Sequence, residues 1–210
     1  MAKKHDIIWL ESVESTNNEA RKHISDLDNL SVLSAYRQTA GRGQRGNTWS
    51  SKAGQNLTFT IILKYGDTPM SEIRAIDQFA ISEIAALSVT DLLASHGIEA
   101  KVKWPNDIWV DDRKICGILI ENRLDHGHIV ESIVGIGLNV NEIRWPEELP
   151  NPVSIRELTG KEYRIEEELT ILKEKICRRY ELLSDAHGKN MLNDDFGKLM
   201  FRLYEDPELP

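Results

Sequence analysis

Cysteine is scarce in this sequence: only Cys116 and Cys177 occur in 210 residues. Two cysteines supply neither a disulfide framework nor the Cys/His spacing of a zinc site, which suits a reducing compartment. The chain also lacks a long apolar run. Residues 7–10 are apolar but are followed at once by acids, so the stretch is too short for a signal peptide or a membrane span. We therefore expect a cytoplasmic protein with no membrane partner.

Positive charge is in deficit, with 26 Lys and Arg against 34 Asp and Glu, which gives a formal net charge of -8. Non-specific binding to DNA or RNA needs a surplus of basic side chains on one face. Any basic site must therefore be local. There is no internal repeat or low-complexity stretch, and the length suits one sizeable core, or one core with a small appendage.

Short segments of alternating polarity dominate the middle of the chain, and helical patterns fall early and late. Strands are expected over residues 5–10, 31–36, 57–64, 100–104, 108–110, 114–124 and 129–140, and helices from near Ser15 to about Ile24, over 72–96, and over 166–183. Ser71 is expected to cap the second helix and Gly97 to end it. This order predicts an α+β fold with a mixed, mostly antiparallel central sheet and helices packed on one face.

Three glycines fall within six residues of the run at 41–46, Gly-Arg-Gly-Gln-Arg-Gly. Glycine lets a ligand approach backbone amides closely, and arginine supplies a forked donor, so the loop is typical of a phosphate or carboxylate clamp. The spacing fits neither a Walker A loop nor a dinucleotide fingerprint. The alternative is a mobile linker or an RNA-binding Arg/Gly tract, but such tracts are repeated and sit in basic chains.

Two later runs carry polar residues beside glycine. Residues 103–107 read Lys-Trp-Pro-Asn-Asp and are followed by Lys114 and by Gly117 inside an apolar strand. Pro-Asn-Asp is also a common turn composition, whereas a glycine within a strand marks a bulge or a close approach to the backbone. Residues 135–140 read Gly-Ile-Gly-Leu-Asn-Val, which in a strand gives one apolar face and one cleared face that ends in an amide. A strand cleared only to pack a helix is the alternative.

Together these runs supply the groups that an acyl-adenylating site needs. Arg42 and Lys114 can neutralise a carboxylate and a phosphate, which otherwise repel each other. Asn106, Asp107 and Asn139 offer amide and carboxylate groups that suit a sugar or Mg²⁺. Neutral hydrogen-bond donors and acceptors come from Ser15, Thr16, Asn17 and Gln38. Trp49 and Trp104 offer flat apolar walls. The six histidines are scattered on polar stretches, and no Ser/His/Asp or Cys/His arrangement competes.

In this order the motifs resemble those of the biotin protein ligases, the biotin-[acetyl-CoA-carboxylase] ligases of bacteria. The matching segments are 15–17, Gln38, 41–49, 103–107, 113–114 with Gly117, and 135–139. The resemblance implies a catalytic domain over residues 1–204 with the class II aminoacyl-tRNA synthetase-like fold of biotin and lipoate ligases. It also implies a two-step reaction. In the first step biotin and ATP, with Mg²⁺, give biotinyl-5′-AMP. In the second step biotin passes to one lysine of a biotin carboxyl carrier protein of acetyl-CoA carboxylase. The resemblance also allows a homodimer, with a second copy of the chain as a partner.

The same resemblance implies roles for individual residues. Lys114 and Arg42 would be catalytic, and Asp107 would contact the metal. The implied biotin-binding residues are Ser15, Thr16, Asn17, Gln38, Gly41, Arg42, Gly43, Gln44, Lys114 and Gly117. The implied ATP-binding residues are Arg42, Asn47, Trp49, Asn106, Asp107, Lys114 and Asn139.

The sequence departs from the family pattern in three places. Gln44 and Asn47 stand where many members carry arginine. Only 14 residues precede Ser15, too few for a three-helix DNA-binding domain, so we expect neither that domain nor a DNA partner. Residues 205–210 would be the start of a missing or truncated C-terminal β-barrel. Two rival functions stay open: lipoate or octanoate transfer, disfavoured because the Arg and triple-glycine motif of lipoate ligases is not found, and a non-catalytic biotin-binding module.

Overall fold

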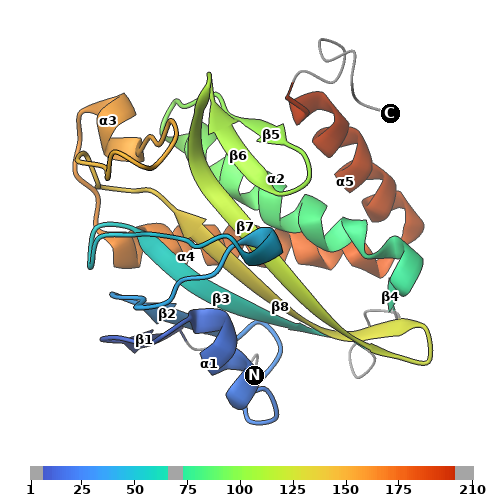
Figure 1. Ribbon diagram of the computed structural model, residues 1–210. Helices are drawn as coiled ribbons and strands as arrows, with labels where there is room; N and C mark the ends of the chain where they lie inside the picture. The colour runs from blue at the N-terminus through green and yellow to red at the C-terminus, as the bar shows by residue number, and fades with distance from the viewer. Residues whose placement is uncertain (1–6, 66–72, 202–210) are drawn as a thin grey trace.

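The computed structural model describes residues 7–65 and 73–201 and centres on an eight-stranded sheet (Figure 1). Seven strands follow the order β1-β2-β3-β8-β7-β6-β5, and β4 pairs with β8. The strands are β1 (Ile7–Leu10), β2 (Val32–Ala35), β3 (Leu57–Lys64), β4 (Ile73–Arg74), β5 (Lys101–Lys103), β6 (Asp107–Val110), β7 (Arg113–Asp125) and β8 (His128–Leu138). Only β1 and β2 pair in parallel within this sheet, so the expected mixed, mostly antiparallel sheet is confirmed.

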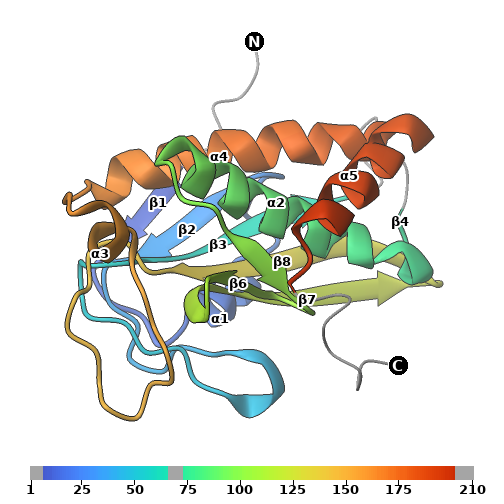
Figure 2. The same cartoon turned by 90° about the horizontal axis from the view of Figure 1, so that it is seen from above.

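The three long helices cover one face of the sheet, as expected (Figure 2). They are α2 (Phe79–Ser95), α4 (Ile165–Glu181) and α5 (Ala186–Leu199). The short helix α1 (Thr16–Lys22) packs on the opposite face, where Ala20 contacts a small second core that includes Leu33 and Ile62. Three 3₁₀ turns (Gln44–Gly46, Ala75–Asp77 and Leu182–Ser184) and the helix α3 (Ile155–Thr159) complete the elements. None of the helices in the described ranges is long and apolar enough to cross a membrane.

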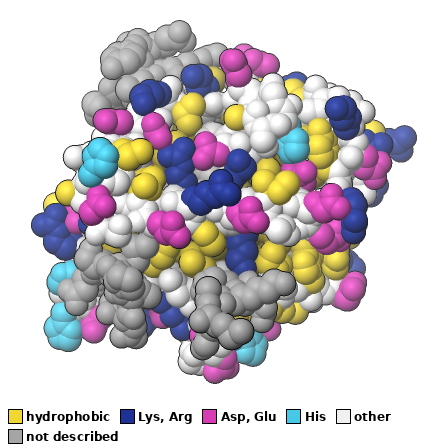
Figure 3. Space-filling view, turned by 180° about the vertical axis from the view of Figure 1, so that it is seen from behind, with side chains coloured by type: hydrophobic (Ala, Val, Ile, Leu, Met, Phe, Trp, Pro, Cys, Tyr) yellow, Lys and Arg dark blue, Asp and Glu magenta, His cyan; other side chains and the backbone are white. Residues whose placement is uncertain are grey.

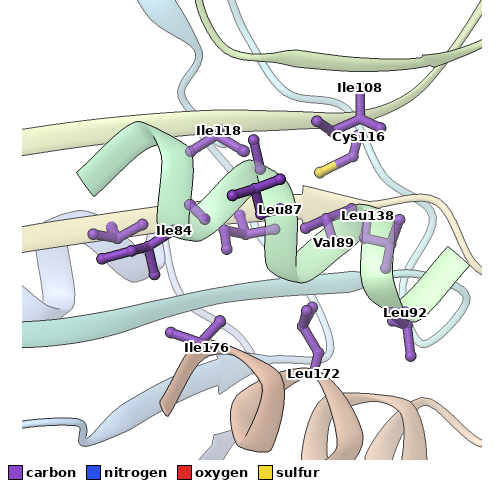
Figure 4. Close-up of a cluster of buried hydrophobic side chains, with 14 of the residues drawn as sticks. Ile84, Leu87, Val89, Leu92, Ile108, Cys116, Ile118, Leu138, Leu172 and Ile176 are labelled. Atoms are coloured by element: carbon purple, nitrogen blue, oxygen red, sulfur yellow. The ribbon is translucent and has the colours of Figure 1, made fainter. Parts of the chain in front are cut away.

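The main core lies between the sheet and the long helices. Alternate residues of β3, such as Phe59 and Ile61, are buried on this side, and α2 lies across the strands beside α4, with Leu87 and Leu92 buried in the layer (Figure 4). The expected apolar stripe of the last predicted helix is buried on α4 and the turn after it: Leu169, Leu172, Ile176, Tyr180 and Leu183. Burial of these apolar side chains supplies the main driving force for folding.

The outer surface of the helical layer carries charges of both signs. Figure 3 views this side, and Lys and Arg side chains alternate there with Asp and Glu. The helix α4 contributes to the mixture because acids occupy its first turn and bases its last, in agreement with the helix dipole. This face therefore does not gather the single-sign charge that a phosphate backbone requires.

Two parts of the expected secondary structure are wrong. The second helix begins at Phe79 rather than at 72, because the buried Ile73 pairs with Ile129 at the sheet and residues 75–77 form a 3₁₀ turn. The chain after Leu183 holds a helix that the pattern did not predict, α5. Its glycines and asparagines are weak helix formers, and packing of Phe196 against Phe79 stabilises it instead.

Other expectations are confirmed or lie outside the structure. Gly97 has φ +75° just beyond the C-cap of α2, the left-handed conformation that glycine adopts at low cost. Ser71, the start of the first strand at residues 5–6, and the segment at 205–210 fall outside the described residues.

Candidate active site

A cleft of about 230 Å³ opens on the face of the sheet that carries α1. Its walls come mainly from the start of α1, the glycine loop, the turn between β5 and β6, and the strands β7 and β8, with single residues from the segment after β2 (Gln38) and from β3 (Phe59). The expected site residues that line it are Ser15, Thr16, Asn17, Gln38, Arg42, Gly43, Gln44, Asn47, Trp49, Asn106, Asp107, Lys114 and Gly117. The sheet therefore brings most of the expected site together.

The two expected cations line this one cleft, and an acid holds each of them. Lys114 Nζ lies 2.8 Å from Asp107 Oδ1, across the adjacent strands β7 and β6. Arg42 Nη2 lies 3.1 Å from Glu121 Oε1, and Arg42 Nη1 donates to Asn18 Oδ1 at 2.9 Å. Both positive charges are thus positioned before any ligand arrives, which lowers the reorganisation that binding an anion requires.

Glu121 is a member of the site that the sequence analysis missed. Its carboxylate accepts a hydrogen bond from Asn17 Nδ2 at 2.9 Å and pairs with Arg21 at 2.7 Å as well as with Arg42. Burial alone raises its pKa, but the hydrogen bonds from Asn17 and Arg21 and the charges of Arg21 and Arg42 outweigh burial and hold the pKa below its ordinary value. The sequence could have indicated Glu121 as a site residue, because Glu121 lies on the same face of the strand as Gly117 and Leu119.

One end of the cleft is polar and uncharged. Gln38 Oε1 accepts from the Thr16 backbone N–H at 2.8 Å and from the Thr16 hydroxyl at 3.1 Å. Ser15 is the N-cap residue of α1, as its sequence position predicts, but its side chain makes no capping hydrogen bond. The hydroxyl of Ser15 is therefore left for the cleft that it lines. Neutral donors and acceptors of this kind suit an uncharged polar head group.

The floor of the cleft is cleared by glycine, but side chains of the protein itself occupy the cleared space. A Cβ atom on Gly137 would collide with the Trp49 indole, and one on Gly117 would lie 3.0 Å from the same ring. A Cβ atom on Gly135 would collide with the Asn17 amide. The sequence correctly indicated a close approach to these strands, and the structure identifies Trp49 and Asn17 as the groups that approach.

The two expected tryptophan walls have different outcomes. Trp49 lines the cleft, with its indole Nε1 buried and without a hydrogen-bond partner in the described part of the chain. Lys114 Nζ lies 5.8 Å from the centre of the same ring, within the range of a cation–π interaction. Trp104 is 56% exposed and does not line the cleft, so its expected role as a wall is wrong.

Two expected site residues lie behind the cleft. Asn139 is buried, and its Nδ2 donates to the backbone carbonyls of Val153 at 3.0 Å and Lys114 at 3.4 Å, so it fixes the strand that carries Lys114. Gly41 closes the glycine loop: its carbonyl accepts from Trp49 N at 3.0 Å, and a Cβ atom there would collide with the Trp49 carbonyl. Direct ligand contacts by these two residues stay predictions. Arg45, which was not singled out, adds a second guanidinium and a third cation to the lining.

The cleft offers few side chains that could bind a metal ion beside Asp107, where a metal contact was expected. Asp107 is the one carboxylate in the lining of this cleft, and its charge is paired with Lys114. Across residues 7–65 and 73–201 no group of three or more His, Cys, Asp or Glu could hold a metal ion. Mg²⁺ often binds through substrate phosphates, waters and one or two carboxylates. The residues present fit an ion carried in with a polyphosphate rather than a resident metal site.

Comparisons with known proteins agree with this geometry. The biotin/lipoate A/B protein ligase family matches residues 9–139. The bifunctional ligase/repressor BirA of Escherichia coli (strain K12) is 31% identical over 140 residues, which cover 66% of this chain and 42% of that protein. The biotin-[acetyl-CoA-carboxylase] ligase of Paracoccus denitrificans is 33% identical over 187 residues, which cover 85% of this chain and 74% of that protein.

Among solved structures, the biotin protein ligase from Aquifex aeolicus in complex with biotin and ATP superposes with a TM-score of 0.77 at 27% identity. The superposition covers 93% of this chain and 78% of that one. The match thus spans less than half the length of BirA and about three-quarters of the Aquifex chain. With a family match over more than half of its residues and a relative one-third identical over most of its length, the chain belongs to the biotin/lipoate A/B protein ligase family.

Proposed function

We propose that this protein activates biotin with ATP to give biotinyl-5′-AMP and pyrophosphate, and then transfers biotin to a lysine of a biotin carboxyl carrier protein. The observation that carries the proposal is the shared cleft of Arg42 and Lys114, which has an uncharged polar end at Thr16 and Gln38. Biotin has a neutral, polar ring system at one end and a carboxylate at the other. The cleft has matching chemistry at both ends.

The first step needs no general base, because the attacking carboxylate is already an anion. An oxygen of that carboxylate attacks the α-phosphorus, the new acyl–phosphate bond forms, and pyrophosphate leaves with the electron pair of the broken P–O bond. Two anions must meet, so catalysis reduces to positioning and charge neutralisation. Lys114 is the group assigned to bridge the carboxylate and the phosphate, and Arg42 neutralises the same region from the glycine loop.

We propose the remaining roles from the chemistry and the positions of the side chains. Ser15, Thr16 and Gln38 bind the biotin ring system, with Asn17 held beside them by Glu121. Asn47, Asn106 and Asp107 face the nucleotide, and Asp107 is the residue that would contact a magnesium ion on the phosphates. Such an ion supplies charge neutralisation at the transferring phosphoryl group.

The second step forms an amide from the carrier lysine amine and releases AMP. The adenylate is a mixed anhydride that water hydrolyses, so the cleft must exclude water until the carrier docks. We also place the protein in the cytoplasm. Its two cysteines are free thiols, one buried and one half-buried, as suits a reducing compartment.

The test is mass spectrometry of a biotin carboxyl carrier domain after incubation with the protein, MgATP and biotin. A gain of one biotin on a single lysine is expected. Replacing biotin with lipoate or octanoate tests the rival transfer, and omitting the carrier while following pyrophosphate tests activation alone. Binding of biotin without pyrophosphate release would favour the non-catalytic module and overturn the proposal.

A further inference from the structure

The polar end of the cleft rests on a side chain that does not touch the cleft itself. Thr60 lies in β3, is 0% exposed and is not among the lining residues. Its hydroxyl lies 2.7 Å from Asn17 Oδ1 and 2.9 Å from Thr16 Oγ1. One buried hydroxyl therefore contacts two neighbouring residues of the site, both at the start of α1.

The orientation of the Asn17 amide decides where the Thr60 proton goes. Asn17 Nδ2 donates to Glu121 Oε2 at 2.9 Å and to the Leu119 carbonyl at 3.3 Å, and both of these atoms can only accept. The oxygen of the amide must therefore face Thr60, where it can only accept. A hydroxyl has one proton, so Thr60 donates to Asn17 and offers its lone pairs to Thr16.

The Thr16 hydroxyl is constrained in turn. Its proton has two acceptors within the protein, Thr60 Oγ1 at 2.9 Å and Gln38 Oε1 at 3.1 Å. In either case the proton is committed inward, and the oxygen of Thr16 presents lone pairs to the cleft. Gln38 Oε1 is also occupied by the Thr16 backbone N–H, so the free end of the Gln38 amide is its NH₂. The cleft thus presents an acceptor at Thr16 beside a donor at Gln38.

We propose that Thr60 is a positioning residue that sets this donor and acceptor pattern and thereby selects a ring carrying both N–H and C=O groups, such as the cyclic urea of biotin. The inference rests on the proposed function and deepens it. The sheet supports the arrangement from the neighbouring strand, because Thr60 pairs with Gly135, whose missing Cβ leaves the space that the Asn17 amide fills.

The test compares three variants in β3. Thr60→Val removes the hydroxyl and keeps the shape, and we expect the Kd and KM for biotin to rise about tenfold, the typical effect of one lost hydrogen bond. The KM for ATP and the kcat of adenylate formation should change less than about twofold, because ATP binds at the other end. Thr60→Ser keeps the hydroxyl and should restore binding. Desthiobiotin retains the cyclic urea and should lose the same factor as biotin.

Thr58→Val is the matched control. Thr58 lies two residues earlier in β3, is equally buried and donates its hydroxyl to the Ala35 carbonyl at 2.8 Å, outside the cleft lining. This variant should lose stability but bind biotin like the wild type. The inference is overturned if Thr58→Val weakens biotin binding as much as Thr60→Val, if Thr60→Val binds normally, or if Thr60→Ser fails to restore binding.

The failure of the proposed function is a separate outcome. A wild-type protein that does not bind biotin overturns that function and this inference with it, whereas normal binding by both wild type and Thr60→Val overturns the inference alone. Thermal unfolding of each variant establishes that it is folded. Should Thr60→Val not fold, Thr60→Ala carries the same comparison.

Discussion

Replacing Lys114 by alanine removes the cation that we place between the biotin carboxylate and the α-phosphate. The side chain is about one-third exposed (33%), and its Nζ lies 2.8 Å from Asp107 Oδ1. At roughly 4 Å from a reacting anion and an effective dielectric constant of about 20, one charge contributes about 4 kcal/mol. The nearby Asp107 carboxylate offsets part of this. We therefore expect a loss of about 3 kcal/mol of transition-state stabilisation, or roughly a hundredfold in rate.

The assay is biotin-dependent release of pyrophosphate from MgATP in the absence of carrier, which isolates the first step. Lys114→Ala also leaves Asp107 without its cation, so the double variant Lys114→Ala/Asp107→Asn is compared with Asp107→Asn alone, which measures the loss of the proposed nucleotide and magnesium contact of Asp107. If the missing cation is the cause, the double variant stays slower than Asp107→Asn. Lys101→Ala, an exposed lysine on β5 that does not line the cleft, is the control for a general change in charge. A Lys114→Ala rate within about threefold of the wild type would refute the reasoning.

Three further predictions concern the floor of the cleft, the buried acid Glu83 and the half-buried acid Glu121. Gly137→Ala should displace the Trp49 indole and lower the rate of biotin-dependent pyrophosphate release, whereas Gly197→Ala, with open space around its Cβ position on α5, should leave that rate unchanged. Near-ultraviolet circular dichroism reports the displacement of the indole. Equal rates for the two variants would contradict the prediction. Burial raises the pKa of Glu83, partly offset by a hydrogen bond from an amide on α5, so the charged form is disfavoured in the folded state. Glu83→Gln should therefore raise the melting temperature at pH 8, with the gain disappearing as the pH falls below the ordinary pKa of 4.5, and a gain independent of pH would argue against this cause. The pKa of Glu121 is lowered, so its contribution to stability is present above the ordinary value of 4.5 and is lost as the pH falls through the lower folded value. Glu121→Gln should therefore make the melting temperature depend less on pH over that acidic range. Parallel curves of melting temperature against pH for the two proteins would exclude the mechanism.

Local sequence determined the elements whose pattern is strongly periodic. The strand at residues 57–64 and the apolar stripe from Leu169 to Leu183 each appear in the fold as predicted, because the period of the apolar residues is decided within the element. The glycine loop and the glycine-bearing strands were also recognisable, since close approach to a backbone requires a missing Cβ. Arg42 and Lys114 could be expected in one site from their chemistry alone.

Tertiary structure decided what surrounds those residues. The helix α5 forms from weak helix formers because Phe196 packs on α2, and β4 forms because Ile73 completes the sheet beside β8. Trp104, which the sequence analysis placed in the site, is exposed to solvent instead. No local pattern distinguishes a tryptophan that lines a cleft from one that does not.

The sequence also did not identify the residues that hold the site residues in place. Thr60 and Glu121 lie in ordinary strand sequence, yet one orients the start of α1 and the other holds Arg42 and Asn17. Their roles come from contacts across 43 to 104 residues of sequence, which only the pairing of β3, β8 and β7 establishes. The sequence by itself determined which chemical groups are present and which segments are strands or amphipathic helices. The tertiary structure alone decided how they are oriented, because hydrogen-bond direction depends on partners that are distant along the chain.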